Sequence, residues 1–213
     1  MALADLSGLQ SGKLIVGAFS TFLNTVVPAT VAAFSRAYPK VTIEVWDFRA
    51  AQIEEELLRG ELDLGIAFHP TKHAEIETAP LFDERMLLMV SRSHPLAHLQ
   101  THVMNQLAKV PLALLPRSFA MRHLIDDSLR QAGGAPVVRV EMKSVEALLG
   151  VCRSGDLASI VPERAARQAP DLHAMALSAP SIVRHAGILW HRGASRSTAA
   201  LTFGVQMRAA LSG

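Results

Sequence analysis

The sequence predicts an α/β fold built from two similar lobes. Apolar, strand-like segments alternate with segments of helical periodicity along almost the whole chain. The expected strands of the first lobe begin near residues 14, 41 and 62, and those of the second begin near 110, 137 and 157. The steps between strands are therefore 27 and 21 residues, then 27 and 20. Two β-α-β-α-β units with such similar spacing favour two Rossmann-like lobes, each a parallel sheet with right-handed crossovers.

The first lobe has five expected elements. In chain order they are a strand at 13–19, a helix at 27–38, a strand at 41–46, a helix at 50–59 and a strand at 62–68. In the second helix, Ile53, Leu57 and Leu58 have the spacing of an inward-facing stripe, so residues 54–56, all glutamate, are expected to face mostly solvent. Gly60 follows this helix at the position of a C-cap glycine.

The second lobe repeats the pattern. Its expected elements are a strand at 110–115, a helix at 119–131, a strand at 137–142, a helix at 144–153 with Ser144 as N-cap, and a strand at 157–161. Apolar connectors at 86–91 and 182–190 are expected to cross between the lobes, with a short strand at 172–177 and a terminal helix at 198–211. The predicted division is 13–90 with 188–213 for lobe I, 91–187 for lobe II, and 1–12 as a residual linker.

Composition excludes several classes of protein. Of the 213 residues, 50% are apolar and 19% are charged, which is typical of a folded chain. A net charge of +2 makes the chain a poor candidate for binding DNA phosphates by itself. The single Cys excludes a disulfide framework, and no apolar run approaches the roughly 18 residues of a membrane span. The first residues have no basic start and no apolar core of a secretory signal, so a cytoplasmic location is expected.

No catalytic or metal-binding motif is found in the sequence, so we expect a protein that is not an enzyme and has no cofactor or metal. Nucleophile-elbow, P-loop, dinucleotide-binding and zinc-protease patterns are all missing. His94, His98 and His102 have helical spacing. Pro95 argues against a helix there, which favours surface histidines over a zinc site. Cys152 lies on the apolar side of its expected helix, which favours a buried core residue over a reactive thiol.

The expected strand ends suggest a ligand site. Ligands of open parallel sheets bind outside the carboxyl ends of the strands, beside the N-termini of the following helices. Here these positions hold Ser20, Thr21, Phe48, Arg49, Phe68, His69, Arg117, Ser118, Phe119, Lys143, Ser144, Pro162 and Glu163. Free backbone N–H groups and helix dipoles suit a small anion. Helix capping is the alternative role for the hydroxyls, and for Arg49 and Arg117 a solvated or ion-paired surface role is favoured.

Several segments together resemble the effector-binding domain of LysR-type transcriptional regulators. They are GKLIVG at 12–17 followed by Ser20 and Thr21, FSRAYPKV at 34–41, LLRGELDLGIA at 57–67, PLFDERMLLMV at 80–90, SHPLA at 93–97 and LASIVP at 157–162. The resemblance covers residues 9–211. Within the family, the segments at 53–68 and 114–122 are most similar to the cyanate-operon regulator and its relatives.

The resemblance implies a fold like type 2 periplasmic binding proteins, with two crossover strands and an effector cleft between the lobes. Its effector contacts map onto Ser20, Thr21, Phe68, Ser118, Ser144 and Pro162. It also implies a winged helix-turn-helix ahead of this domain, through which alone operator DNA would be bound, and homodimers or homotetramers. In such dimers, helix 27–38 and strand 41–46 of one chain would pair with helix 119–131 and its neighbouring strand of the other. Relatives with large acidic effectors often bind them through arginines in the cleft. In this sequence only Arg49, Arg117 and Arg122 are candidates for that role.

The leading interpretation is therefore a domain that senses a small, anionic effector for a transcriptional regulator. A solute-binding protein of a transport system is the alternative with the same fold, and an enzyme on this scaffold is a third reading without a supporting motif. If the site assignment holds, Ser20→Ala, Thr21→Ala and Ser144→Ala are expected to weaken effector binding while leaving thermal stability nearly intact.

Overall fold

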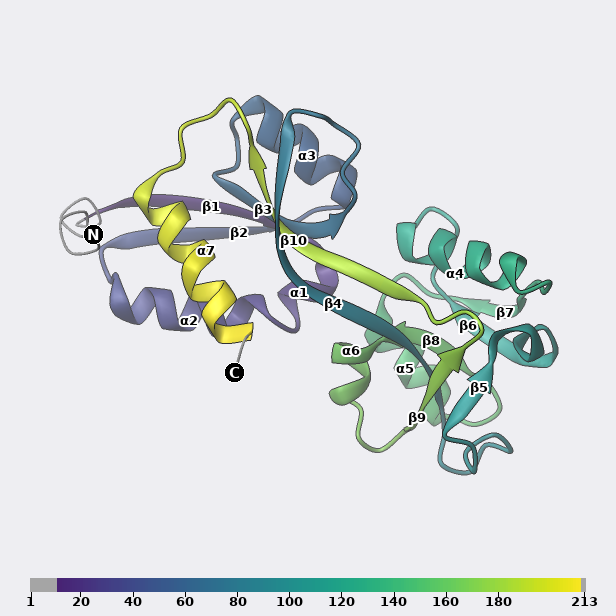
Figure 1. Ribbon diagram of the computed structural model, residues 1–213. Coiled ribbons are helices and arrows are strands. Elements are labelled where there is room, and N and C mark those ends of the chain that lie inside the picture. The colour runs from purple at the N-terminus through teal and green to yellow at the C-terminus, as the bar shows by residue number, and fades with distance from the viewer. Residues whose placement is uncertain (1–10, 212–213) are drawn as a thin grey trace. The chain divides into compact units, whose positions relative to one another are not determined.

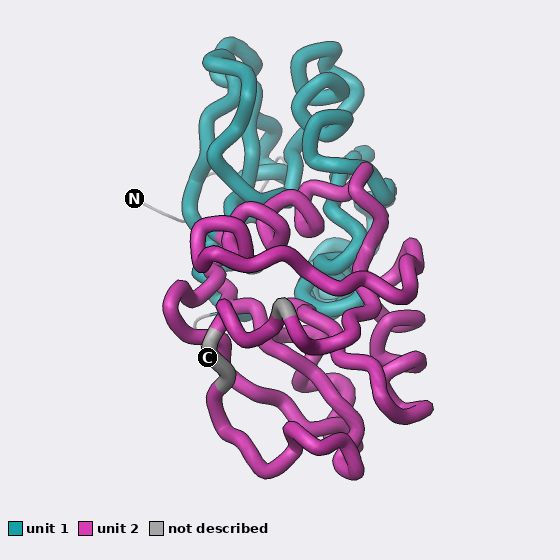
Figure 2. The backbone as a smooth tube through the Cα atoms, turned by 90° about the vertical axis from the view of Figure 1, so that its right-hand side faces the viewer, with its two compact units in different colours: residues 1–83, 185–213 teal, residues 84–184 magenta. Residues whose placement is uncertain are grey.

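The structure is a computed structural model that describes residues 11–211, including all their side chains except those of His102, Val103 and Ala108. The chain forms two compact units (Figure 2). Unit 1 comprises residues 1–83 and 185–213, and unit 2 comprises residues 84–184. The divisions thus fall at 83/84 and 184/185, whereas the sequence suggested 90/91 and 187/188. Most of the expected linker 1–12 lies outside the described residues.

Unit 1 is a mixed sheet with helices on both faces (Figure 1). Strand β1 (Gly12–Ala18) pairs in parallel with β2 (Val41–Asp47) and with β3 (Leu64–His69), and β3 pairs antiparallel with β10 (Val183–His191). The sheet order β2-β1-β3-β10 leaves β2 at one edge. Helices α1 (Ser20–Leu23), α2 (Val27–Ala37), α3 (Ala50–Arg59) and α7 (Thr198–Leu211) complete the unit.

Alternation along β1 divides the core of unit 1 into two layers. Leu14, Val16 and Ala18 are buried on the side that α2 and α7 cover with Phe34 and Phe203. The opposite side packs against α3 and the residues around it, which contribute Ile53, Leu57 and Leu62. Successive strand residues point to opposite faces, so both faces of β1 and β3 carry apolar side chains, as expected for a strand covered on both sides.

Unit 2 repeats the strand order of unit 1. Strand β6 (Pro111–Leu114) pairs in parallel with β7 (Val137–Glu141), and a parallel bridge from Leu112 to Ala158 joins it to the start of β8 (Ser159–Pro162). Helix α4 (Ala120–Gln131) connects β6 to β7, and α5 (Val145–Arg153) connects β7 to β8. The order β7-β6-β8 corresponds to β2-β1-β3, so the repeated β-α-β-α-β pattern predicted from the spacing is confirmed.

The first crossover strand is longer than the sequence suggested, whereas the second, β10, has the predicted length of nine residues. Strand β4 (Ile76–Val90) runs for 15 residues and pairs antiparallel with β8 and with β9 (His173–Ser178), while β5 (Thr101–Val103) joins the edge beyond β9. A 3-10 helix (Met104–Lys109) and the short helix α6 (Glu163–Arg167) were not expected. These pieces are too short to show an apolar period of their own. No helix within 11–211 is both long enough and apolar enough to span a bilayer.

One expected surface residue is buried. Glu54 was predicted to face solvent, but only 3% of it is exposed. One carboxylate oxygen, Oε2, accepts hydrogen bonds from the backbone N–H groups of Lys72 and His73, at 2.8 and 3.0 Å. A buried carboxylate needs such donors to offset the loss of hydration. Glu54 therefore fixes the loop after β3 to helix α3.

Candidate functional site

The rim of unit 1 is formed where β1, β2 and β3 end. Phe19 follows β1 and donates its backbone N–H to the carbonyl of Ile66 on β3, at 3.0 Å. Helix α1 then begins at Ser20, which is exposed. The Ser20 hydroxyl donates to Oδ1 of Asp47, the last residue of β2, at 2.7 Å. A carboxylate thus already accepts from one of the predicted effector contacts, and Asp47 is a rim residue that the sequence reasoning did not single out.

Thr21 and Phe68 lie on the same rim. The Thr21 side-chain oxygen Oγ1 is buried and makes no hydrogen bond within the described residues. Leaving a buried hydroxyl unsatisfied costs about 1–3 kcal/mol. Phe68, at the end of β3, packs its ring against Phe19 and Phe22 at centroid distances of 5.6 and 4.6 Å. The predicted residues of unit 1 therefore form one group: two hydroxyls beside an aromatic cluster.

In unit 2, Ser144 has the capping role that was its alternative. It precedes α5 in extended conformation, and its Oγ accepts the backbone N–H of Ala147 at 3.1 Å. Loss of such a cap costs about 0.5–2 kcal/mol. With this cap in the structure, we now expect Ser144→Ala to lower thermal stability as well. The hydroxyl hydrogen of Ser144 is not used in this contact and can still donate to an acceptor.

Ser118 and Pro162 lie at the ends of the two neighbouring strands. Ser118 is exposed in the turn between β6 and α4, and the N-cap of α4, Phe119, provides no side-chain cap. Pro162 is buried at the end of β8, where α6 begins. Because β7, β6 and β8 are parallel neighbours, their carboxyl ends lie at the same edge of the sheet. Three predicted residues, Ser118, Ser144 and Pro162, are thus brought to one rim of unit 2.

The candidate arginines differ in their surroundings. Arg122 is only 2% exposed and donates to Asp126, Glu141 and the carbonyl of Leu115, at 2.7–2.9 Å. Burial lowers the pKa of Arg122, but the hydrogen bonds that its guanidinium donates to Asp126 and Glu141 outweigh this effect, so the pKa is raised. As a candidate for binding the effector, Arg122 is therefore ruled out: its guanidinium holds unit 2 together. Arg117 is exposed and lies 3.8 Å from Asp126, and Arg49 is exposed at the start of α3.

A buried ion pair in unit 2 was missed by the sequence reasoning. Arg184 donates to Glu84 at 2.6 Å, and both side chains are at most 4% exposed. Glu84 also accepts the backbone N–H of Arg164, at the start of α6, at 3.2 Å. Burial lowers the pKa of Arg184 to about 10, against the raising effect of Glu84, so the guanidinium stays charged at neutral pH. No local signal marks this pair, because its members lie 100 residues apart.

The described residues show no cluster that could hold a metal ion. No group of three or more His, Cys, Asp or Glu side chains that could hold a metal ion occurs among them. The side chain of His102, one member of the histidine row, lies outside the described part. Cys152 is fully buried, and burial raises the pKa of its thiol to about 11. The prediction of a core cysteine rather than a reactive thiol is confirmed, since the thiolate is the reactive form.

Comparison with known proteins places this fold in a family. A sequence profile described as the LysR substrate binding domain matches residues 7–212. The uncharacterized HTH-type transcriptional regulator YybE of Bacillus subtilis (strain 168) is 26% identical over 194 residues, which cover 91% of this chain and 66% of that protein. The effector binding domain of QuiR in complex with shikimate has a TM-score of 0.82 at 19% identity, covering 95% and 98% of the two chains. The CcmR regulatory domain of Synechocystis PCC6803 in complex with 2-PG has a TM-score of 0.84 at 19% identity, covering 94% and 98%.

These findings confirm the predicted fold class, an α/β fold like that of type 2 periplasmic binding proteins. The chain spans about half to two thirds of the length of the first curated relatives it matches. The profile covers nearly all of the chain, including both β-α-β-α-β units and the terminal helix. The protein therefore belongs to the LysR substrate binding domain family.

Proposed function

We propose that this chain is the effector-sensing domain of a LysR-type transcriptional regulator and that its effector is a small anion. The observation that carries the proposal is the family match over residues 7–212. The solved domains of QuiR and CcmR hold shikimate and 2-PG, which are small molecules. We propose Ser20, Thr21 and Phe68 as effector contacts of unit 1, and Ser118, Ser144 and Pro162 as those of unit 2.

The geometry of each rim supports an anionic ligand. In unit 1, the Ser20 hydroxyl already donates to a carboxylate oxygen, which shows what kind of acceptor it can serve. An anionic effector takes the place of the Asp47 carboxylate at this hydroxyl. In unit 2, the Ser144 hydroxyl retains its hydrogen, and the uncapped N-terminus of α4 beside Ser118 offers backbone N–H groups.

The binding of operator DNA is a separate part of this proposal. The relative YybE is named as an HTH-type regulator, and the chain covers 66% of it. We propose that operator DNA is bound only through an N-terminal helix-turn-helix domain, and that the regulator acts in the cytoplasm as a homodimer or homotetramer. We further propose that the chain catalyses no reaction. Turnover of an effector by the purified protein would contradict this.

The cyanate-operon regulator-like subgroup remains part of this proposal. It rests on the segments 53–68 and 114–122 of the sequence. A very small anion fits a rim that supplies hydroxyls and backbone N–H groups and in which Arg122 is occupied elsewhere. Under this proposal cyanate binds more tightly than shikimate or 2-PG.

Calorimetric titration with cyanate, shikimate and 2-PG tests the site. We expect Ser20→Ala and Thr21→Ala each to weaken binding of the preferred anion about 5- to 30-fold, as the loss of one hydrogen bond of about 1–2 kcal/mol predicts. Asp47→Asn removes the competing negative charge and is expected to strengthen binding. Ser35→Ala, an exposed serine on α2, is the matched control. Unchanged affinity in Ser20→Ala, Thr21→Ala and Ser144→Ala together would refute the site assignment.

A further inference from the structure

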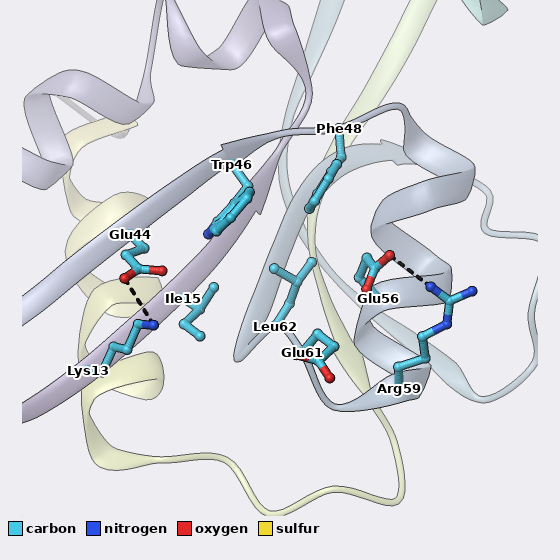
Figure 3. Close-up of a pocket in the computed structure, with 9 residues that line it drawn as sticks. All are labelled: Lys13, Ile15, Glu44, Trp46, Phe48, Glu56, Arg59, Glu61 and Leu62. Atoms are coloured by element: carbon cyan, nitrogen blue, oxygen red, sulfur yellow. Dashed lines mark hydrogen bonds and ion pairs between the residues drawn. The ribbon is translucent and has the colours of Figure 1, made fainter.

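Unit 1 has a pocket on the sheet face that carries α3 (Figure 3). Lys13 and Ile15 of β1 and Glu44 and Trp46 of β2 point to this face, as their pairing register requires. Helix α3 covers β1 and β3 on this side, but β2 is an edge strand and extends beyond it. The result is a pocket of about 440 Å³ between the open part of the sheet and α3. Pockets that bind small molecules have volumes of roughly 300–1,000 Å³.

The apolar part of the pocket is aromatic. The rings of Trp46 and Phe48 are stacked, with centroids 6.1 Å apart and planes inclined by 11°. Ile15 and Leu62 continue the apolar lining beside them. Trp46 nevertheless remains 49% exposed. A large aromatic side chain left open at the edge of a pocket offers a π face on which a planar or apolar group can pack.

The charged part of the pocket carries an excess of negative charge. Lys13 is paired with Glu44 at 2.9 Å, and Arg59 is paired with Glu56 at 3.0 Å. Both basic groups of the lining are therefore engaged. Glu61 adds a third, exposed carboxylate, for which no ion pair is found in the described part of the chain. Three carboxylates against two basic groups leave a net charge of −1 in the lining of the pocket.

We propose that this pocket binds a small organic cation with a planar, apolar body, such as an arylalkyl ammonium or an aryl guanidinium. The body packs on Trp46 and Phe48, and the cationic group is attracted by the carboxylates of the lining, whose excess charge comes from Glu61. Both the aromatic quadrupole and the excess carboxylate favour a positive charge. None of the six proposed effector contacts lines this pocket. The site is therefore additional to the effector site and selects the opposite charge.

Three probes with the same ring test the charge preference: 2-phenylethylamine, the neutral 2-phenylethanol and the anion 3-phenylpropionate. Trp46 is an internal reporter, because the second tryptophan of the chain, Trp190, is only 3% exposed. We expect the amine to change Trp46 fluorescence saturably and to protect it from acrylamide quenching. The alcohol is expected to bind about tenfold more weakly, and the anion not to bind saturably. Equal binding of all three, or no saturable binding of the amine, would overturn the proposal.

Variants locate the site by calorimetry, which does not depend on the fluorophore. Trp46→Ala is expected to weaken amine binding at least tenfold and Glu61→Gln about fivefold. Both positions are exposed, so unchanged thermal unfolding will confirm that the fold is intact. Glu55→Gln removes a charge from the exposed side of α3 outside the pocket and is expected to change nothing. Ser20→Ala should also leave amine binding unchanged. Amine binding that survives both Trp46→Ala and Glu61→Gln would refute this site.

Discussion

The two units share a strand order but differ in what fills their interiors. The main core of unit 1 contains Phe19, Phe22, Phe34, Trp190 and Phe203, several of which are in ring contact. The buried core of unit 2, as far as the structure describes it, has aliphatic and methionine side chains and no aromatic ring. Unit 2 instead buries two arginines that bond to carboxylates. The same topology is thus stabilised by ring packing in one unit and by buried polar links in the other.

This difference affects how each rim is held. In unit 1, Phe68 is positioned by its aromatic neighbours. In unit 2, Arg122 connects the end of β6 to α4 and β7, and Glu84 connects β10 to the start of α6. A buried ion pair depends on both partners, because removing one side chain leaves the charge of the other buried without an opposite charge. Unit 2 is therefore expected to be the more sensitive of the two to single charge deletions.

The largest effect is expected from Glu84→Ala in unit 2. The change leaves the buried Arg184 guanidinium without its carboxylate and is expected to lower the free energy of unfolding by about 3–5 kcal/mol. Urea denaturation of the purified domain measures it. The double variant Glu84→Met with Arg184→Met removes both charges and should recover more than half of the loss. A double variant no more stable than Glu84→Ala would show that the pair is not the cause.

A smaller effect is expected from the buried carboxylate of unit 1. Glu54 is bound by two neutral backbone N–H groups and not by an arginine. Glu54→Gln keeps an acceptor oxygen but loses the charge-assisted strength of both bonds, so we expect a loss of about 1–2 kcal/mol in urea denaturation. Glu55→Gln, next to it and exposed, should stay within about 0.5 kcal/mol of the parent. If Glu54→Gln costs as much as Glu84→Ala, the contrast between the units fails.

The smallest effect is expected at the rim hydroxyls. Ser144→Ala removes the cap of α5 and is expected to cost about 1 kcal/mol. Ser20→Ala in unit 1 breaks only an exposed bond to Asp47 and should cost about 0.5 kcal/mol or less. Thermal unfolding of both variants compares them directly. Equal stability of the two would mean that the Ser144 contact with Ala147 contributes nothing to the folded state.

Most of the fold could be predicted because its signals are local. The helix at 50–59 and the glycine cap after it were predicted with the bounds that the structure has, and Gly60 adopts the left-handed conformation such a cap needs. The buried state of Glu54 was missed, although it adjoins the stripe of Ile53 and Leu57 on the helix surface. From sequence alone, an acidic residue at the border of an apolar stripe is predicted to face solvent. The backbone N–H groups that bind the Glu54 carboxylate are 18 and 19 residues away, so the helix pattern does not reveal them.

The candidate site was predictable to a lesser degree. The family resemblance selected three of the strand-end residues in each lobe, and the structure brings each set of three to one rim. The surroundings of these residues could not be predicted. The Ser20 hydroxyl donates to Asp47, and the side-chain oxygen of Thr21 is buried without a hydrogen bond within the described residues. The interaction of Arg122 with Glu141 joins α4 to β7 and so depends on how helix and strand pack.

The sequence by itself determined the alternation of strands and helices, the duplication of the β-α-β-α-β unit and the family. Periodicity, capping and spacing act between residues that are close along the chain, so they can be recognised without coordinates. Only the tertiary structure decided which charges are buried, which hydroxyls are already bonded, and that Trp46 and Glu61 line one pocket. Those properties arise when segments distant in sequence exclude water from one another, and this depends on packing rather than on local pattern.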